Sequence, residues 1–431
     1  MKQLFTNAHI LTMAEDATPL LHASMVVEDG VIQWIGTSPP DIKEFDQITD
    51  LQGRLVLPGW INTHGHGAMA LLRGYGDDLP LQTWLEEKMW PMEARFGSDQ
   101  VFWGTSLAVL EMIRGGTTCF ADMYDHMDQV AQVVKESGIR ASLCRGVIGL
   151  GSLEEQETKR QEAVRFVQDW NGQADGRITT MIAPHSSYTC PPPYIEKLVE
   201  DSVRLDVPIH IHLSETRREV QQNVEDYGVR PVEHLKQLGV FQRPALVAHA
   251  VHVNEEEIDI LKQHDVKISH NPGSNLKLGS GIAPVPQMLK KGLRPSLGTD
   301  GAASNNNLDL LEEIQLAALI HKGFTEDPEV VPATTALKMG TVYGAEALFI
   351  DHETGTLEKG KKADFITLDI SGAHMQPRHN LVSLLVYSAS RDDVQDVFVD
   401  GVALMRNREC LTMDEERIRF EAEKAIQALI P

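Results

Sequence analysis

Residues 55–66, LVLPGWINTHGH, decide the fold, because an apolar run there leads directly into two histidines. The apolar run predicts a buried strand. His64 and His66 follow at positions i and i+2, and such residues point to the same side of an extended chain. Both imidazoles can therefore reach one metal ion, and the pattern predicts a functional site at the end of a strand.

The same pattern recurs along the middle of the chain, where short apolar runs alternate with amphipathic stretches. Residues 98–116 and 127–138 have helical spacing and separate expected strands. The expected strands are residues 55–64, 117–123, 141–149, 179–186, 208–215, 245–253, 267–274 and 294–301. Eight strand–helix units favour an α/β fold of the TIM type, a (β/α)8 barrel. A doubly wound open sheet is the alternative.

Ionisable side chains end nearly every expected strand, and packing cannot explain this pattern. They are His64 and His66 after the first strand, Arg145 after the third, His185 after the fourth, His212 and Glu215 after the fifth, His249 after the sixth, His270 after the seventh and Asp300 after the eighth. In a barrel the loops that follow the strands converge on one face. The sequence therefore predicts a site at that face.

The two ends of the chain are β-rich and differ from the middle. Asp-Gly pairs at residues 29–30 and 400–401 predict tight turns between apolar runs. We expect residues 1–56 and 355–431 to form one small β-sandwich, and residues 57–354 to form the barrel. Residues 413–430 have helical spacing and an acidic first turn, which predicts a terminal helix.

Composition excludes several classes of partner. The formal net charge of −23 repels nucleic-acid phosphates and anionic membrane surfaces. The four cysteines are far apart and form no Cys-x-x-Cys pair. There is no signal-peptide core and no run of about twenty apolar residues. We therefore expect a cytoplasmic protein without a nucleic-acid or membrane partner; whether it forms a homodimer or a homotetramer stays open.

The histidines and one aspartate form a candidate metal site. His210 and His212 repeat the His-x-His pattern at a second strand end, and Asp300 lies in the segment GTDG. Three neutral imidazoles and one carboxylate suit zinc or iron(II) and leave a position for water. A metal there lowers the pKa of that water towards about 7.

A carboxylate near the metal is needed to move the proton of that water. Glu215, three residues past His212, is the expected shuttle. His249 can hydrogen-bond the water or the developing oxyanion, and Asp300 can accept the remaining proton. Three other signatures are missing: His-Glu-x-x-His, the His-x-Glu with Pro-Cys-x-x-Cys of cytidine-type deaminases, and Gly-x-Ser-x-Gly.

Longer motifs carry a resemblance over nearly the whole chain. They are PGWINTHGHGAMALLRG, HIHLSET, AHAVHV, SHNPGSNLKLGSGIAPV and LGTDGAASNNNLDLLEE. The chain resembles the amidohydrolase superfamily, and within it the 5′-methylthioadenosine/S-adenosylhomocysteine deaminases of the chlorohydrolase-like branch. This resemblance implies a metal-dependent hydrolase of cyclic amidine C–N bonds.

The resemblance also implies roles for matching residues. The metal ligands would be His64, His66, His212 and Asp300, with His210 a neighbour inside the barrel. The catalytic residues would be Glu215, His249 and Asp300. The substrate contacts would be Glu93, Arg145, His185, Glu215 and Asp300. Related dinuclear enzymes carry a bridging lysine on the fourth strand, which is absent here, so one divalent metal is expected, zinc first and iron(II) second.

Structural roles compete with several of these assignments. Glu93 could pair with Arg95 or Lys88 on a helix surface, and Arg145 could bridge acidic loops. His185 could be a hydrogen-bonded residue of the barrel mouth, and His270 is expected to be structural.

The expected reaction is hydrolytic deamination of adenine nucleosides to an inosine-type product and ammonia. The substrates implied are 5′-methylthioadenosine, S-adenosylhomocysteine and adenosine. Two alternatives remain: a deaminase or dechlorinase of another ring, such as guanine, an oxidised purine or a triazine, and a catalytically silent binding barrel.

Overall fold

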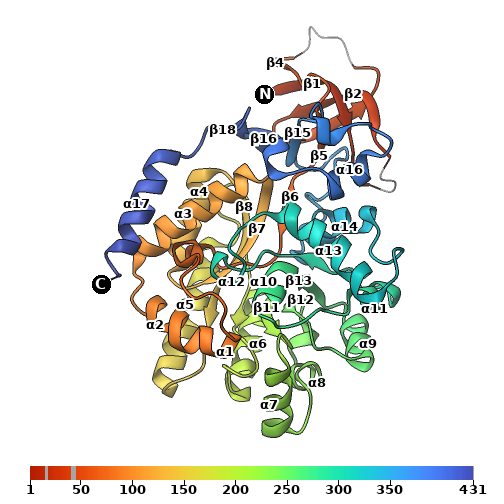
Figure 1. Ribbon diagram of the computed structural model, residues 1–431. Coiled ribbons are helices and arrows are strands. Elements are labelled where there is room, and N and C mark those ends of the chain that lie inside the picture. The colour runs from red at the N-terminus through yellow and green to blue at the C-terminus, as the bar shows by residue number, and fades with distance from the viewer. Residues whose placement is uncertain (15–17, 40–44, 431) are drawn as a thin grey trace.

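A computed structural model describes residues 1–14, 18–39 and 45–430, and its centre is a barrel of parallel strands (Figure 1). The barrel strands are β6 (Trp60–Asn62), β7 (Thr117–Tyr124), β8 (Arg140–Val147), β9 (Ile178–Thr180) with β10 (Ala183–Pro184), β11 (Ile209–Leu213), β12 (Ala245–His249), β13 (Lys267–His270) and β14 (Ser296–Leu297). All pairings among them are parallel, and most of their residues are buried, as expected for a sheet covered on both faces.

Two seams close the strands into a ring. Ile182 and Ser186 form parallel bridges to Ile209 and His212 at the first seam. At the second seam, the Thr63 amide donates to the Leu297 carbonyl at 2.9 Å, which joins β14 back to β6. The barrel prediction is therefore confirmed, and the open-sheet alternative is excluded.

Amphipathic helices surround the barrel strands. They are α3 (Ser98–Arg114), α4 (Met127–Ser137), α5 (Leu153–Trp170), α6 (Pro192–Leu205), α7 (Arg217–Tyr227), α8 (Pro231–Gln237), α9 (Glu255–Gln263), α10 (Pro272–Lys277), α11 (Val285–Lys290), α12 (Ala302–Asn305), α13 (Leu310–Thr325), α14 (Ala333–Met339) and α15 (Val342–Ala347). Short polar side chains begin several of them: Ser152 accepts the Glu155 amide at the start of α5. The two expected helices correspond to α3 and α4.

Strands from both ends of the chain combine in one nine-stranded sheet, drawn in red and blue side by side in Figure 1. They are β1 (Lys2–Ile10), β2 (Leu20–Glu28), β3 (Val31–Gly36), β4 (Gln47–Asp50), β5 (Leu55–Pro58), β15 (Phe365–Leu368), β16 (Val394–Val399), β17 (Val402–Arg406) and β18 (Glu409–Cys410). The sheet curls so that Val31 bridges Lys362. Its inner face packs the rings of Phe5, Phe365 and Phe398 together.

Local details of this sheet follow the sequence closely. Both Asp-Gly pairs form turns with positive φ, at 49° and 80° for residues 29–30 and at 49° and 70° for residues 400–401.

The expected first strand divides at Gly59, where a Cβ would lie 2.1 Å from the side chain of Thr118. Residues before Gly59 pair in the sheet and those after it begin the barrel. The exact domain boundaries stay a prediction.

The terminal helix α17 (Glu415–Gln427) is confirmed within residues 413–430. Asp414 caps it by accepting the Arg417 amide. The helix lies against α3, where Glu415 pairs with Arg114 at 2.8 Å (Figure 1). Two short helical segments, α16 (Leu381–Tyr387) and the turn Ala373–Met375, complete this end of the chain. Among the described residues, no helix is long and apolar enough to cross a membrane.

A buried arginine joins the sheet to the foot of the barrel. Arg140, at the start of β8, donates to Asp364 Oδ2 at 2.8 Å and to Asp400 Oδ1 at 2.7 Å. Glu353 lies 3.4 Å from the same guanidinium. The side chains of Arg140 and Asp364 are 3% and 1% exposed, so the pair is shielded from water. Each of the two charges therefore needs the other as its partner, because water solvates neither of them.

Arg140→Ala should therefore lower the free energy of unfolding by about 3–5 kcal/mol, because Asp364 would be left buried without a counter-charge. Urea unfolding followed by tryptophan fluorescence measures this change. Arg165→Ala is the matched control, since Arg165 makes ion pairs that are about half exposed, and its loss should stay below about 1 kcal/mol. Equal losses in the two variants would contradict the proposed link.

Candidate active site

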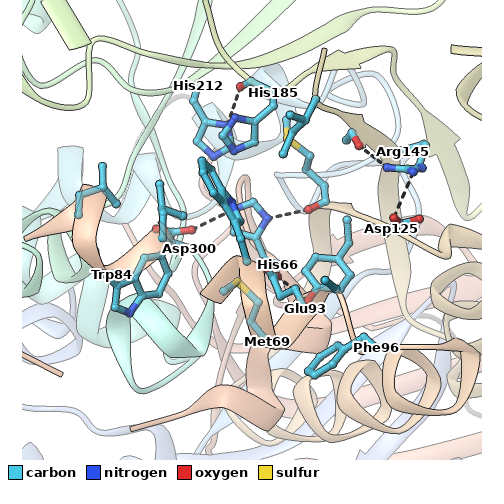
Figure 2. A pocket seen from close by; sticks show the side chains of 18 of the residues that line it. His66, Met69, Trp84, Glu93, Phe96, Asp125, Arg145, His185, His212 and Asp300 are labelled. Atoms are coloured by element: carbon cyan, nitrogen blue, oxygen red, sulfur yellow. Dashed lines mark hydrogen bonds and ion pairs between the residues drawn. The ribbon is translucent and has the colours of Figure 1, made fainter. Parts of the chain in front are cut away.

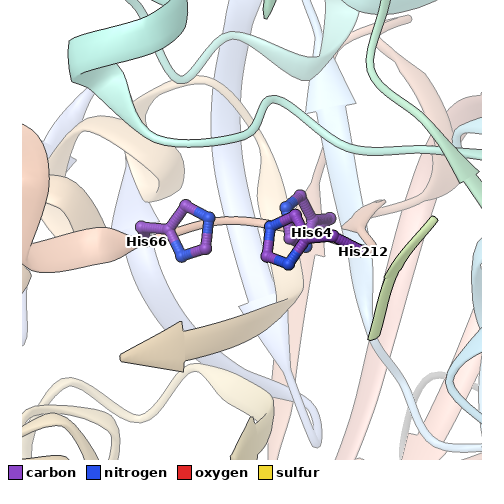
Figure 3. Close-up of side chains that lie close together, drawn as sticks. All are labelled: His64, His66 and His212. Carbon is purple, nitrogen blue, oxygen red and sulfur yellow. The ribbon is translucent and has the colours of Figure 1, made fainter. Parts of the chain in front are cut away.

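Three histidines from two strand ends converge at the mouth of the barrel (Figure 3). His64 and His66 follow β6, and His212 lies on β11. One ring nitrogen from each lies within 4.8 Å of the others. A second group with the same limit joins His64 to His249 and Asp300. The structure therefore brings the predicted ligands together, with His249 beside them.

Hydrogen bonds fix which nitrogen of each ring faces the centre. His66 Nδ1 lies 2.6 Å from the Met123 carbonyl, and His212 Nδ1 lies 2.8 Å from the His185 carbonyl. A carbonyl only accepts, so each Nδ1 carries a proton, and each Nε2 has a lone pair whenever the ring is neutral. His64 Nδ1 lies 3.1 Å from His210 Nε2, while His64 Nε2 is buried with no hydrogen-bond partner. Three imidazole nitrogens within 4.8 Å of one another fit a metal cation that takes the place of a proton.

Asp300 completes this donor set. Its Oδ1 lies 3.5 Å from His64 Nε2 and 3.3 Å from His66 Nε2. The hydroxyls of Ser274 and Ser304 donate to the other oxygen, Oδ2, at 2.6 and 2.8 Å. The two serines thus orient the carboxylate so that Oδ1 faces the imidazoles.

The electrostatics of the cluster favour a positive charge at its centre. Burial opposes protonation of His66, but the hydrogen bond and charge of Asp300 outweigh it and raise the pKa of His66 to about 9. Burial also opposes the charged form of Asp300, yet the imidazoles around it hold its pKa well below the usual range. A divalent cation would supply this positive charge, and three imidazoles with one carboxylate are a common zinc-type donor set.

Glu215 and His249 lie beside this donor set. Glu215 Oε2 is 3.9 Å from His249 Nε2, and the Ser280 hydroxyl donates to Glu215 Oε1 at 3.4 Å. Burial raises the pKa of Glu215, and the neighbouring His249 partly offsets this. His249 Nδ1 lies 2.8 Å from Asn275 Oδ1, so its Nε2 faces the cavity. A carboxylate with a raised pKa at this place suits proton transfer.

A cavity of about 470 Å³ lies over these groups (Figure 2). Its far wall is apolar and comes from the segment between β6 and α3, with Met69, Leu81, Trp84, Leu85, Trp90 and Phe96. Glu93, at the end of the short helix α2 (Trp90–Glu93), also lines the cavity. The Tyr124 hydroxyl donates to Glu93 Oε1 at 2.6 Å, and burial raises the pKa of Glu93. Its bond to Tyr124 places Glu93 inward, unlike the surface pairing considered above.

His185 lies at the inner end of the cavity against the candidate ligands. Its ring centre is 4.6 Å from that of His212, and its Nδ1 is 3.0 Å from the Thr189 hydroxyl. Burial, together with nearby His66 and His249, lowers the pKa of His185 to about 3. The ring is therefore neutral, and its exposed edge faces the cavity.

Arg145 lies at the rim and is held by two carboxylates. Its Nη2 is 3.1 Å from Asp125 Oδ2 (Figure 2) and 3.0 Å from Glu162 Oε2. Arg145 thus bridges acidic groups, one on the loop after β7 and one on α5, close to the loop bridging that the sequence left open. Arg145 also lines the cavity, so both the structural and the substrate-contact reading fit its position.

Two other strand-end histidines do not line the cavity. His270 points away from the mouth, and its Nε2 lies 3.3 Å from Nε2 of His321 on α13. His210 lies inside the barrel below His64. Sequence reasoning missed several polar residues that support the site: Asp122, Tyr124, Ser274, Asn275, Ser280 and Ser304. They lie within β7, on or after α10 and on α12, and their residue types are common in such segments, so no clear signal in the sequence marked them.

Comparison with known proteins identifies the family. A sequence model of the amidohydrolase family matches residues 55–404. The chain belongs to the amidohydrolase family. A relative of this amidohydrolase in Halalkalibacterium halodurans, named 5-methylthioadenosine/S-adenosylhomocysteine deaminase, is 49% identical, with 100% of this chain and 99% of the relative covered. A relative of the same name in Syntrophomonas wolfei is 47% identical, with 100% of both chains covered.

Solved structures give the same assignment. A crystal structure described as an adenosine deaminase from Xanthomonas campestris with bound zinc is 33% identical to this amidohydrolase. It matches with a TM-score of 0.93 and covers 99% of this chain and 98% of its own. The resemblance inferred from the motifs is confirmed: this amidohydrolase is a hydrolase built on a TIM-type barrel, with a donor cluster that fits a divalent metal.

Proposed function

We propose that this amidohydrolase deaminates adenine nucleosides, with 5′-methylthioadenosine and S-adenosylhomocysteine as its main substrates and adenosine as a further one. The products are the inosine-type nucleoside and ammonia. The observation that carries the proposal is Glu215, a buried carboxylate 3.9 Å from His249 and directly beside the metal-type cluster. Full-length relatives named for this activity support the choice of substrate.

The proposed cofactor is one zinc ion per chain, with iron(II) as the alternative. His64, His66, His212 and Asp300 would hold it. The nearness of the three histidine nitrogens to one another, and of Asp300 Oδ1 to His64 and His66, supports this set. The fourth barrel strand ends in His185 and offers no lysine to bridge a second metal. When bound, a divalent metal lowers the pKa of water and supplies a nucleophile at neutral pH.

Glu215 is proposed to move the protons of the reaction. Attack of water oxygen on the ring carbon that bears the amino group forms the C–O bond, while Glu215 delivers a proton to the adjacent ring nitrogen. His249 Nε2 faces Glu215 and can accept a hydrogen bond from the water, because its Nδ1 proton is held by Asn275.

Asp300 is proposed to complete the proton transfer. Its Oδ1 accepts the Gly301 amide at 2.8 Å but no hydroxyl, since Ser274 and Ser304 donate to Oδ2, and a second lone pair of Oδ1 remains. It can take the second water proton and pass it to the amino group. The C–N bond then breaks, ammonia leaves, and the ring retains a carbonyl.

Three residues are proposed to bind the rest of the substrate. Glu93 faces the cavity and can accept hydrogen bonds from both ribose hydroxyls. His185 offers a neutral ring edge to the purine. Arg145 lies at the rim, in reach of a 5′ substituent. The apolar wall beside Glu93 suits a thioether at the 5′ position of the nucleoside.

The protein is further proposed to act in the cytoplasm on small molecules, without nucleic acid or membrane. The net charge of −23 supports this because it repels polyanions. The homodimer and the homotetramer remain the candidate assemblies.

A substrate panel tests the proposed function. Wild-type kcat/KM, read as ammonia release, should be higher for 5′-methylthioadenosine, S-adenosylhomocysteine and adenosine than for guanine and a chlorotriazine. Glu93→Ala should then lower kcat/KM for the nucleosides by about ten- to a hundredfold, as expected when a charged hydrogen-bond partner is lost. Activity on ribose-free rings, where measurable, should be unchanged.

The exposed Glu87 lies on the same segment and provides the matched control, since Glu87→Ala should keep full activity on every substrate. Equal losses on nucleosides and ribose-free rings in Glu93→Ala would show that Glu93 supports the fold and not the sugar. A wild-type preference for guanine or the triazine would overturn the nucleoside assignment.

A further inference from the structure

The turn that carries Glu215 away from β11 has an unusual backbone conformation. Ser214 has a φ of 49°, which is uncommon for a residue other than glycine. Helix α7 begins two residues after Glu215, with Thr216 as its cap. The Ser214 carbonyl accepts the His252 amide at 2.9 Å, but among the described residues the Ser214 and Glu215 amides have no backbone partner. The direction of the Glu215 side chain therefore depends on what holds these two amides.

One buried side chain holds both amides of this turn. Glu219 Oε1 accepts the Ser214 amide at 2.7 Å, and Glu219 Oε2 accepts the Glu215 amide at 2.7 Å. The Glu219 residue is only 5% exposed. Thr216 in turn accepts the Glu219 amide at 3.1 Å, which fixes the first turn of α7 under the carboxylate.

Glu219 lies in the first turn of α7, where an acidic side chain also stabilises the helix, so the test must separate that role from positioning. Within the part of the chain that the structure describes, no arginine or lysine pairs with Glu219. Burial raises the pKa of Glu219 to about 7, while the hydrogen bonds from the two amides act against this rise. A buried acidic group is costly unless its oxygens are hydrogen-bonded, and here the amides are its partners.

We propose that Glu219 is a positioning residue that aims Glu215 at the substrate. Its two oxygens hold consecutive amides and so fix the backbone from which the Glu215 side chain extends. Glutamine cannot replace it, because its amide group has one oxygen and would direct an NH2 group at the second N–H. This inference rests on the proposed role of Glu215 as the proton shuttle.

The test is Glu219→Gln in the metal-loaded enzyme, assayed for deamination of 5′-methylthioadenosine. We expect kcat to fall by about ten- to a hundredfold, the range caused by small displacements of catalytic groups. KM should change little and metal content should be unchanged. Glu257→Gln is the matched control: Glu257 is 3% exposed and accepts the Asn254 amide at the start of α9, but it does not line the cavity. It should alter stability and leave kcat unchanged.

The same substitution in a Glu215→Gln background separates positioning from general damage. If Glu219 acts through Glu215, the double variant should be no more than about twofold slower than Glu215→Gln alone, because effects on one catalytic unit do not add. Full activity in Glu219→Gln, or an equal loss in both backgrounds, would overturn the inference. Should Glu219→Gln fail to fold, Glu219→Asp gives the same comparison with a carboxylate too short for both amides. A Glu215→Gln enzyme with wild-type activity would instead refute the proposed shuttle.

Discussion

His212→Ala is expected to abolish turnover and to lower the metal content well below the one equivalent per chain proposed for the wild type. His212 Nε2 is one of three lone pairs that face the cluster centre, and its Nδ1 is anchored to the His185 carbonyl at 2.8 Å. Alanine removes one of the proposed ligands, and the neighbouring His249 lies in the second donor group, with His64 and Asp300 and not with His66. Elemental analysis and ammonia release on the same sample measure both effects.

His321→Ala is the matched control for the loss of a buried histidine. His321 is also buried, but it pairs with His270 outside the cavity. The control should keep metal and turnover, even if it unfolds more easily. Two equivalents of metal in the wild type, both needed for activity, would contradict the single-metal proposal. Full metal content in His212→Ala would remove His212 from the ligand set.

Much of the barrel could be predicted from the sequence because each strand is a local pattern. Eight strand–helix units also favoured a closed barrel, but the contacts that close it could not be predicted, since they join residues far apart, such as the Thr63 amide and the Leu297 carbonyl. The division of the expected first strand at Gly59 was also hidden. It reflects the close approach of Thr118, a neighbour in space that the local pattern does not reveal.

The candidate ligands could be proposed from the sequence because four compatible side chains, His64, His66, His212 and Asp300, come at the ends of expected strands. Which way His270 points follows only from the alternation of side chains along its strand. Ser269 faces the barrel interior, where its hydroxyl lies 2.8 Å from that of Thr63, so the next residue points towards the helices. Once one residue of a strand is known to face the barrel interior, the alternation of side chains therefore tells which histidines of that strand face the interior and which face the helices.

The partners of the candidate residues were not predictable. Ser274 and Asn275 come from α10, and they contact Asp300 and His249 only after the barrel has formed. The ion pairs of Arg145 with Asp125, which follows β7, and with Glu162 on α5 likewise depend on how these elements pack in the folded barrel. Sequence spacing identifies the groups that do chemistry better than the groups that orient them.

Glu215→Gln is expected to keep its metal and to lose about 10²–10⁴-fold in kcat, the usual contribution of a general acid–base group. Glutamine has nearly the same shape and can still accept the Ser280 hydroxyl, which donates to Glu215 Oε1 at 3.4 Å. It cannot carry a proton from water to the ring nitrogen. The loss should therefore appear in the chemical step, with KM changed little, and steady-state kinetics with metal analysis measure it.

Glu225→Gln, at an exposed position on α7, is the control for a lost carboxylate near the same helix, and it should behave as wild type. The relation between metal and rate decides the role of Glu215. Its carboxylate lies 3.9 Å from His249 Nε2 and belongs to neither group of converging donor atoms, so a shuttle leaves metal occupancy intact while the rate falls. If metal and activity fall together in Glu215→Gln, Glu215 is a ligand, and the proton must travel through His249 or Asp300 instead.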